Sequence, residues 1–164
     1  MPNWCNNSIT ISHPDVEKID AIEKELNKSD NDCAICNLIH PRPASEEDNW
    51  YDWNVQNWGT KWDLSIHDDT YERDGNTISF DFDSAWAPPI ALYEYMIEQG
   101  YDIRAYYHEG GMAFCGKFED GCDYYYEYEW NRESIEELPE DLLDYTGVLD
   151  YFDDCEKENE EEVD

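Results

Sequence analysis

Alternating apolar and polar positions predict several β-strands along the chain. Over residues 7–12 (NSITIS), Ile9 and Ile11 alternate with polar side chains, and residues 77–83 (TISFDFD) show the same period. A two-residue period marks a strand with one buried face. Further strands are predicted at residues 64–67, 101–108, 112–118 and 122–130.

A three- to four-residue apolar spacing predicts helices between these strands. Residues 16–28 form an amphipathic helix, and residues 87–99 form a second one that Gly100 ends. A third helix is predicted over residues 134–145, with Ser134 as its cap and Glu137 three residues on. Residues 29–49 read as a loop with one helical turn at residues 35–39, and no regular element is predicted after residue 150.

The order of these elements is strand, helix, strand, strand, helix, strand, followed by two further strands and a helix. We therefore predict an α+β fold, a ferredoxin-like βαββαβ sandwich with a mainly antiparallel sheet. The predicted organisation is a ferredoxin-like domain at residues 1–130, an acidic helix on or beside it at residues 131–150, and a frayed acidic tail at residues 151–164. Aromatic residues make up 15% of the sequence, with seven Trp and 13 Tyr, which favours a folded core over disorder.

Charge separates the end of the chain from the rest. The 164 residues carry a net charge of -32, and 20 of the 42 acidic residues lie in residues 119–164, where Arg132 and Lys157 are the basic residues. A protein that binds a phosphate backbone or an anionic membrane needs clustered Lys and Arg. The sequence therefore predicts no direct nucleic-acid ligand and no membrane, and favours a protein partner with a strongly positive face.

Three motifs resemble a known family. They are Met1–Asn7 (MPNWCNN), Asn57–Asp63 (NWGTKWD) and Phe82–Pro89 (FDSAWAPP). Together they resemble the YubB ferredoxin-like domain family over residues 1–130. The resemblance implies a ferredoxin-like fold and an origin in phages or plasmids. Because the activity of that family is unassigned, it implies no catalytic residues.

The tryptophan-rich motifs suggest a pocket. The candidate lining residues are Trp4, Trp58, Lys61, Trp62, Asp63 and Trp86. The alternative is that the indoles fill the space between helices and sheet with each N–H bonded to a nearby Asn or Asp, and that Lys61 makes a cation–π contact. The sequence favours this second interpretation.

The acidic segment suggests a partner-binding surface. Its candidate residues are Asp123, Glu127, Glu129, Glu133, Glu136, Glu137, Glu140, Asp141 and Asp144. Residues two apart on one strand face lie ~6.6–6.8 Å apart, close to the ~7 Å between phosphates of one DNA strand. The predicted strand at residues 122–130 would thus hold its acids in a phosphate-like row. The alternative is a solvated acidic surface that specifies nothing.

Catalytic and metal sites have less support. The four histidines are scattered, and Cys33 and Cys36 lack the second ligand pair of a zinc site. Asp63, Asp81 and Asp83 would suit a divalent cation only if the fold gathers them. We predict a protein that is not an enzyme and has no cofactor and no metal.

We therefore predict a phage- or plasmid-type accessory protein that mimics DNA and inhibits a host nucleic-acid-binding protein. Defence nucleases, repair enzymes, polymerases and nucleoid proteins are candidate targets, and counter-defence is one such role. A small-molecule or divalent-cation domain using the WGTKWD motif is the alternative, and a virion component is a third.

A minor alternative is a uracil-DNA glycosylase inhibitor, because residues 133–135 (ESI) and 138–140 (LPE) resemble part of that phage protein. The first ten residues lack the basic start and apolar core of a secretory signal. We accordingly expect the host cytoplasm as the location. The sequence does not specify an oligomeric state.

Overall fold

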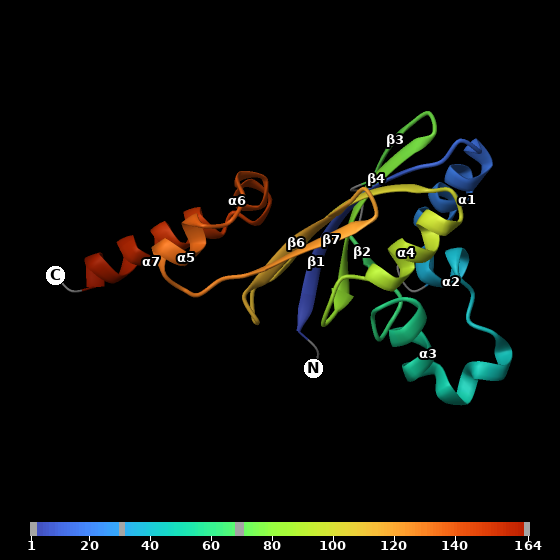
Figure 1. The fold of residues 1–164 in the computed structure, drawn as a ribbon, viewed down its shortest axis with the longest axis horizontal. Coiled ribbons are helices and arrows are strands. Elements are labelled where there is room, and N and C mark those ends of the chain that lie inside the picture. Colours follow the sequence, from blue (N-terminus) through green and yellow to red (C-terminus); the bar gives the residue numbers. More distant parts are fainter. Residues whose placement is uncertain (1–2, 30–31, 68–70, 163–164) are drawn as a thin grey trace.

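The computed structural model describes residues 3–29, 32–67 and 71–162, which form a mixed α+β fold around one antiparallel sheet (Figure 1). The strands are β1 (Trp4–Ser12), β2 (Ser65–Ile66), β3 (Glu72–Asp74), β4 (Thr77–Ala85), β5 (Asp102–Glu109), β6 (Phe114–Glu119) and β7 (Cys122–Glu127). Their order in the sheet is β2-β4-β1-β5-β6-β7, and β3 also pairs with β4.

Helices cover one face of the sheet and enclose the main core. They are α1 (Val16–Leu26), α2 (Ile35–Ile39) and α4 (Ile90–Glu98). The 3₁₀ turn η1 (Ala44–Asn49) and α3 (Trp50–Asn57) follow α2. Alternate strand residues such as Ile9 and Phe80 face the helices and are almost fully buried, together with Ile22 and Met96 from α1 and α4. The predicted inward faces of residues 7–12 and 77–83 are confirmed.

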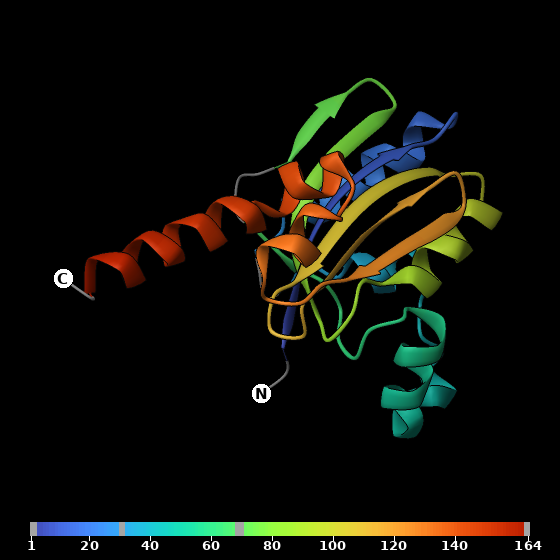
Figure 2. The same cartoon turned by 60° about the vertical axis from the view of Figure 1, so that its left-hand side comes forward.

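The C-terminal helices lie on the opposite face of the sheet. They are α5 (Arg132–Glu136), α6 (Glu140–Thr146) and α7 (Val148–Glu162). A second apolar cluster joins them to the sheet and includes Cys115 on β6, Tyr128, Ile135 on α5 and Leu142 on α6. The layers are therefore helices, sheet and helices at the β5–β6 end, and α7 extends away from the sheet (Figures 1 and 2).

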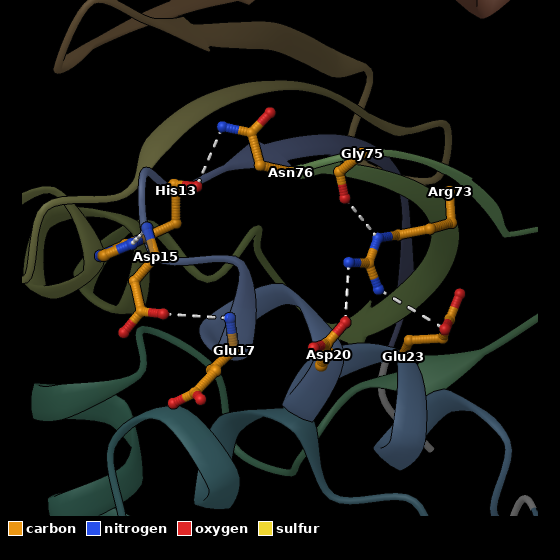
Figure 3. A network of polar contacts seen from close by, with 8 residues as sticks. All are labelled: His13, Asp15, Glu17, Asp20, Glu23, Arg73, Gly75 and Asn76. Carbon is orange, nitrogen blue, oxygen red and sulfur yellow. Dashed lines mark hydrogen bonds and ion pairs between the residues drawn. The ribbon is translucent and has the colours of Figure 1, made fainter.

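A polar network fastens the β3–β4 hairpin to α1 (Figure 3). The guanidinium of Arg73 lies 2.8 Å from Asp20 and 3.5 Å from Glu23 of α1, and its Nε donates to the Gly75 carbonyl at 2.7 Å. The side chain of Asn76 donates to the carbonyl of His13 at 3.1 Å. The hairpin is thereby held over the helix by contacts that span about fifty residues of sequence.

The predicted helix over residues 134–145 is wrong. The chain forms α5 and α6 instead, and they are separated at Leu138 and Pro139. Proline has no backbone N–H and its ring clashes with the preceding helical turn, so a helix ends before it. The N-cap residue also differs from the prediction, since it is Asn131 rather than Ser134. The side chain of Asn131 accepts the backbone N–H of Ser134.

Several boundaries also differ from the prediction. The strand expected at residues 122–130 ends at Glu127, and the helix expected at 16–28 ends at Leu26 with Val16 exposed. The segment after residue 150 was expected to be frayed, whereas the structure continues α7 to Glu162. The tryptophan-rich residues 50–57, which have no clear period, form α3.

Candidate functional site

Two polar side chains build the turn that follows β7. The Oδ1 atom of Asn131 accepts the N–H of Ser134 at 2.8 Å and begins α5. The hydroxyl of Ser134 in turn accepts the N–H of Glu129 at 2.8 Å. Such side-chain caps satisfy backbone groups that a helix start leaves without partners. They bring the segment after β7 beside the first turns of α5.

This turn creates a recess with an acidic lining, called the acidic recess below. Its volume is about 490 Å³, and its lining residues are Glu127, Tyr128, Glu129, Asn131, Glu133, Ser134 and Glu137. Four of the nine acidic residues predicted from the sequence therefore surround one concavity. Tyr128 is 7% exposed and belongs to the second apolar cluster, so the floor of the recess is fixed to the sheet.

The carboxylates of the acidic recess have no cationic partner among the residues that the structure describes. Glu127 accepts the hydroxyl of Tyr125 at 2.9 Å, and Glu129 accepts the amide of Asn131 at 3.3 Å. Burial, followed by the hydrogen bond to Glu127, raises the pKa of the Tyr125 hydroxyl, which therefore stays a donor. The negative charge of the recess is thus not cancelled locally.

The other five predicted acids lie outside the recess. The carboxylate of Asp123 accepts the hydroxyl of Tyr107 at 2.6 Å, on the sheet face that carries α4. Glu136 lies 3.6 Å from Arg132, and Asp141 lies 2.9 Å from Lys117. The hydrogen bond from Lys117 lowers the pKa of Asp141, so this carboxylate is neutralised within the protein. Glu140 and Asp144 are exposed on α6.

The predicted row of three acids on one strand is also wrong in part. Because β7 ends at Glu127, Glu129 lies beyond the strand and does not continue the row. Asp123 and Glu127 share the face of Phe118 and Phe114, their partners on β6, with Tyr125 between them. Carboxylates four residues apart on a strand lie ~13 Å apart, so the phosphate-like spacing is not repeated along β7.

The candidate Trp pocket is divided between two recesses. One, of about 420 Å³, includes Trp58, Trp62 and Asp63, and another, of about 290 Å³, includes Lys61 and Trp86. Trp4 lines neither recess, and its ring centroid lies 6.0 Å from that of Trp62.

The indoles of this region differ in burial. Trp58 is 3% exposed, as the core interpretation expects, but its Nε1–H donates to the backbone carbonyl of His40 at 2.9 Å rather than to an Asn or Asp side chain. Trp86 is 49% exposed and has a φ of 71°, a left-handed conformation that is rare for a bulky residue. The Lys61 ammonium lies 4.5 Å from the centroid of the Trp62 ring, which confirms the expected cation–π contact. The region is therefore part core and part exposed aromatic surface.

The Asp63 carboxylate accepts several backbone N–H groups, which the sequence did not reveal. It accepts the N–H groups of Cys36 at 2.9 Å and Asn37 at 3.0 Å, at the start of α2. It also accepts the N–H of Leu64 at 2.8 Å. Burial raises the pKa of Asp63, and these N–H bonds oppose that effect.

The three aspartates proposed as cation ligands are not gathered by the fold. Asp63 lies against α2, on the helix-covered face. Asp83 accepts the amide of Asn6 at 2.8 Å and lies 3.1 Å from His67, on the other face of β4, which Asp81 shares. Within residues 3–29, 32–67 and 71–162, no group of three or more His, Cys, Asp or Glu side chains is arranged to hold a metal ion.

Asn131 and Ser134 are the site residues that the sequence prediction missed. Asn is a preferred N-cap residue, so Asn131 directly before the helical run Arg132–Glu136 is a helix-start signal that could have found it. Tyr107, which orients Asp123, carries no local signal because its role depends on strand pairing. Tyr125 lies two residues before Glu127 on the same strand, so its contact with Glu127 is local.

No protein-family model matches the sequence, and no curated protein matches it. Among solved structures, the crystal structure of a protein api92 from Yersinia pseudotuberculosis, with the family model DUF1281, is similar, at 23% identity and a TM-score of 0.43. The similarity covers 60% of this chain and 40% of that one, so the chain spans less than half of that structure. No helix of the described residues is long and apolar enough to span a bilayer.

Proposed function

We propose that this protein is a phage- or plasmid-type accessory protein that blocks a host nucleic-acid-binding protein by presenting carboxylates in place of phosphates. The observation that carries the proposal is the acidic recess, where Glu127, Glu129, Glu133 and Glu137 line one concavity and pair with no basic side chain of the part of the chain that the structure describes. A partner's Lys or Arg side chains would supply the missing counter-charges. The net charge of -32 would speed the encounter with a basic face.

The use of the basic residues supports the same proposal. Seven of the ten contact acids, amides or rings of the chain itself: Lys28, Arg42, Lys61, Arg73, Arg104, Lys117 and Arg132. Arg73, Lys117 and Arg132 join one element to another, whereas Lys28 and Lys61 contact residues close by in sequence. The acidic recess receives none of them, which is the pattern expected of a surface kept open for an external cation.

We further propose that the core is ferredoxin-like, related to the YubB family, and that the protein acts in the host cytoplasm. Support for the fold comes from the neighbouring strands β5-β1-β4-β3 and from the helices α1 and α4 that connect them on one face. In chain order these elements follow the βαββαβ scheme.

The proposal is tested by exchanging the four recess glutamates for glutamine. The immobilised wild type should capture nucleic-acid-binding proteins from host lysate at low salt, and duplex DNA should release them. The variant that combines E127Q, E129Q, E133Q and E137Q should lose this capture. Purified uracil-DNA glycosylase is one repair enzyme to include, and its inhibition would identify it as a target.

A matched control separates site chemistry from bulk charge. Glu47, Glu72, Glu94 and Glu98 are exposed on other parts of the molecule, and their exchange for glutamine removes the same charge. This control should retain DNA-competed capture. Equal loss in both variants, or capture that DNA does not reverse, would refute recognition at the acidic recess.

A second candidate is a ligand-binding domain at the tryptophan-rich region. It is favoured by the recess of about 420 Å³, where Arg42 and Asn54 lie beside Trp58 and Trp62. A thermal-shift panel of nucleotides and divalent cations tests it. Stabilisation by one compound that is lost in R42Q would support this function, and a flat panel would oppose it.

A further inference from the structure

The hairpin of β6 and β7 determines which backbone groups face outward. Asp120 and Gly121 form its two-residue turn, and both have positive φ, at 55° and 76°. In such a turn the flanking residues Glu119 and Cys122 form a hydrogen-bonded pair, and the pairs alternate along the strands. Tyr124, Tyr126 and Tyr128 therefore point their N–H and C=O groups toward β6, as the bond from the Tyr128 N–H to the Ala113 carbonyl at 3.1 Å shows.

The main-chain groups of Asp123, Tyr125 and Glu127 consequently point away from β6. Because β7 is the last strand in the sheet order, these groups face the open edge of the sheet (Figure 2). No backbone or side-chain group of the described residues bonds to them. Tyr124 is 44% exposed and Tyr125 is 51% exposed, so the strand is accessible from both faces.

Concavities adjoin this edge near both ends. The acidic recess begins at Glu127. A second recess of about 440 Å³ reaches Asp123 and Tyr125 and is lined by the rings of Trp86, Tyr107 and Phe114. An open strand edge with adjoining pockets is the geometry of proteins that bind a peptide as an additional strand.

We propose that the β7 edge binds an extended, basic segment of a partner protein as an additional antiparallel strand. In antiparallel pairs, residues directly opposite each other share a face. Asp123 and Glu127 would oppose basic residues, and Tyr124 and Tyr126 on the other face would lie beside β-branched residues. The preferred segment thus alternates Lys or Arg with Val, Ile or Thr.

Charge favours a strand of another protein over a second copy of this chain as the partner of β7. Charged side chains commonly protect an open edge against pairing with a second copy, and residues 122–127 (CDYYYE) carry Asp123 and Glu127. With a net charge of -32, two copies repel each other, and pairing of two β7 edges would oppose like charges. A cationic strand meets no such repulsion. This inference goes beyond the proposed function, since it holds for any partner with such a segment.

The probe is the peptide acetyl-Lys-Val-Lys-Val-Lys-Val-Lys-amide. In the free protein, the amide hydrogens of Asp123, Tyr125 and Glu127 should exchange rapidly, and those of Tyr124 and Tyr126 slowly. Adding the peptide should slow the exchange of the Asp123, Tyr125 and Glu127 amide hydrogens. Peptide binding without this protection, no peptide binding, or a dimer of the free protein formed through β7 would overturn the proposal.

Backbone methylation supplies the matched control. A peptide methylated on the lysine nitrogens cannot donate to β7, whereas one methylated on the valine nitrogens keeps those donors and has the same charge. The first should bind at least about tenfold more weakly than the second, because several hydrogen bonds are lost. Equal affinities would overturn strand addition, yet leave recognition at the acidic recess standing. Conversely, if the variant with the four glutamine exchanges still captures host proteins, recognition at the acidic recess is refuted and strand addition at β7 is not.

A variant of the protein tests the same groups. Tyr125→Pro removes one outward N–H without removing a bond to β6, and Tyr125→Thr removes the ring but keeps the N–H. With both variants folded by circular dichroism, the proline variant should bind the probe more weakly than the threonine variant. Equal binding would contradict main-chain recognition at β7.

Discussion

Replacing Asp63 with alanine tests whether this residue is a structural cap or a ligand group. The carboxylate accepts two N–H groups at the start of α2, from Cys36 and Asn37, at 2.9 and 3.0 Å. Cys36 is fully buried, whereas Asn37 is exposed. Water can therefore replace the lost bond at Asn37 but not at Cys36.

The carboxylate also accepts the N–H of Leu64 at 2.8 Å, and the magnitude follows from these three partners. Loss of a cap costs about 0.5–2 kcal/mol, and leaving the buried Cys36 N–H without a partner costs about 1–3 kcal/mol. The substitution also removes a carboxylate whose burial raises its pKa, which offsets part of the loss. We expect a net decrease of about 2–3 kcal/mol in the free energy of unfolding. Asp63→Asn keeps one oxygen acceptor and should cost about half as much.

Urea titration followed by tryptophan fluorescence measures this decrease, because Trp58 and Trp62 lie beside Asp63 in one recess. The melting temperature should fall by roughly 5–10 °C. A change of less than about 0.5 kcal/mol in Asp63→Ala would refute the capping role. Loss of a ligand-induced shift without loss of stability would instead favour the ligand-binding function.

Three further predictions concern the attachment of the C-terminal helices and the packing of β6. A Cβ atom at Gly116 would overlap the hydroxyl of Tyr107 and the backbone of β7. Gly116→Ala should therefore lower the free energy of unfolding by about 3 kcal/mol, measured by thermal unfolding. Gly110→Ala, whose Cβ would make only ordinary van der Waals contact with the His108 ring, should be nearly neutral. The pKa of Asp141 is lowered by Lys117, so this pair stabilises the protein above about pH 4 and ceases to do so as the pH falls through the lowered value. Lys117→Met should reduce the difference between the urea midpoints at neutral and acidic pH, and an unchanged difference would contradict the pairing. Arg132 bonds to Asp153 and Glu156 of α7. In Arg132→Gln, amide exchange along α7 should accelerate while global stability changes by no more than about 1 kcal/mol, and unaltered exchange would argue against this attachment.

Periodicity predicted the sheet core because a strand with one buried face carries apolar residues at every second position. Ile9, Phe80 and Phe82 occupy the inward positions expected from sequence. The same logic failed at residues 134–145, where acidic and apolar residues continue a helical period through Pro139. There the backbone chemistry of one proline outweighed the pattern around it.

The acidic site was predictable in composition but not in shape. Charge placed it in the last third of the chain, yet the recess depends on Asn131 and Ser134, which turn the chain after β7. Likewise, nothing local indicates that Arg132 reaches α7, since its partners lie 21 and 24 residues away.

The distribution of charge pairs links the fold to the proposed function. Lys117 and Arg132 are used to fasten α6 to the sheet and α5 to α7, and each of them neutralises acids there. Asp123, Glu127 and Glu129 instead accept hydrogen bonds from the neutral side chains of Tyr107, Tyr125 and Asn131, respectively. Neutral donors fix the direction of a carboxylate without cancelling its charge. Two of the four recess glutamates, Glu127 and Glu129, are held in this way. Such orientation is not needed for solubility alone, whereas a surface that binds cationic side chains would benefit from it.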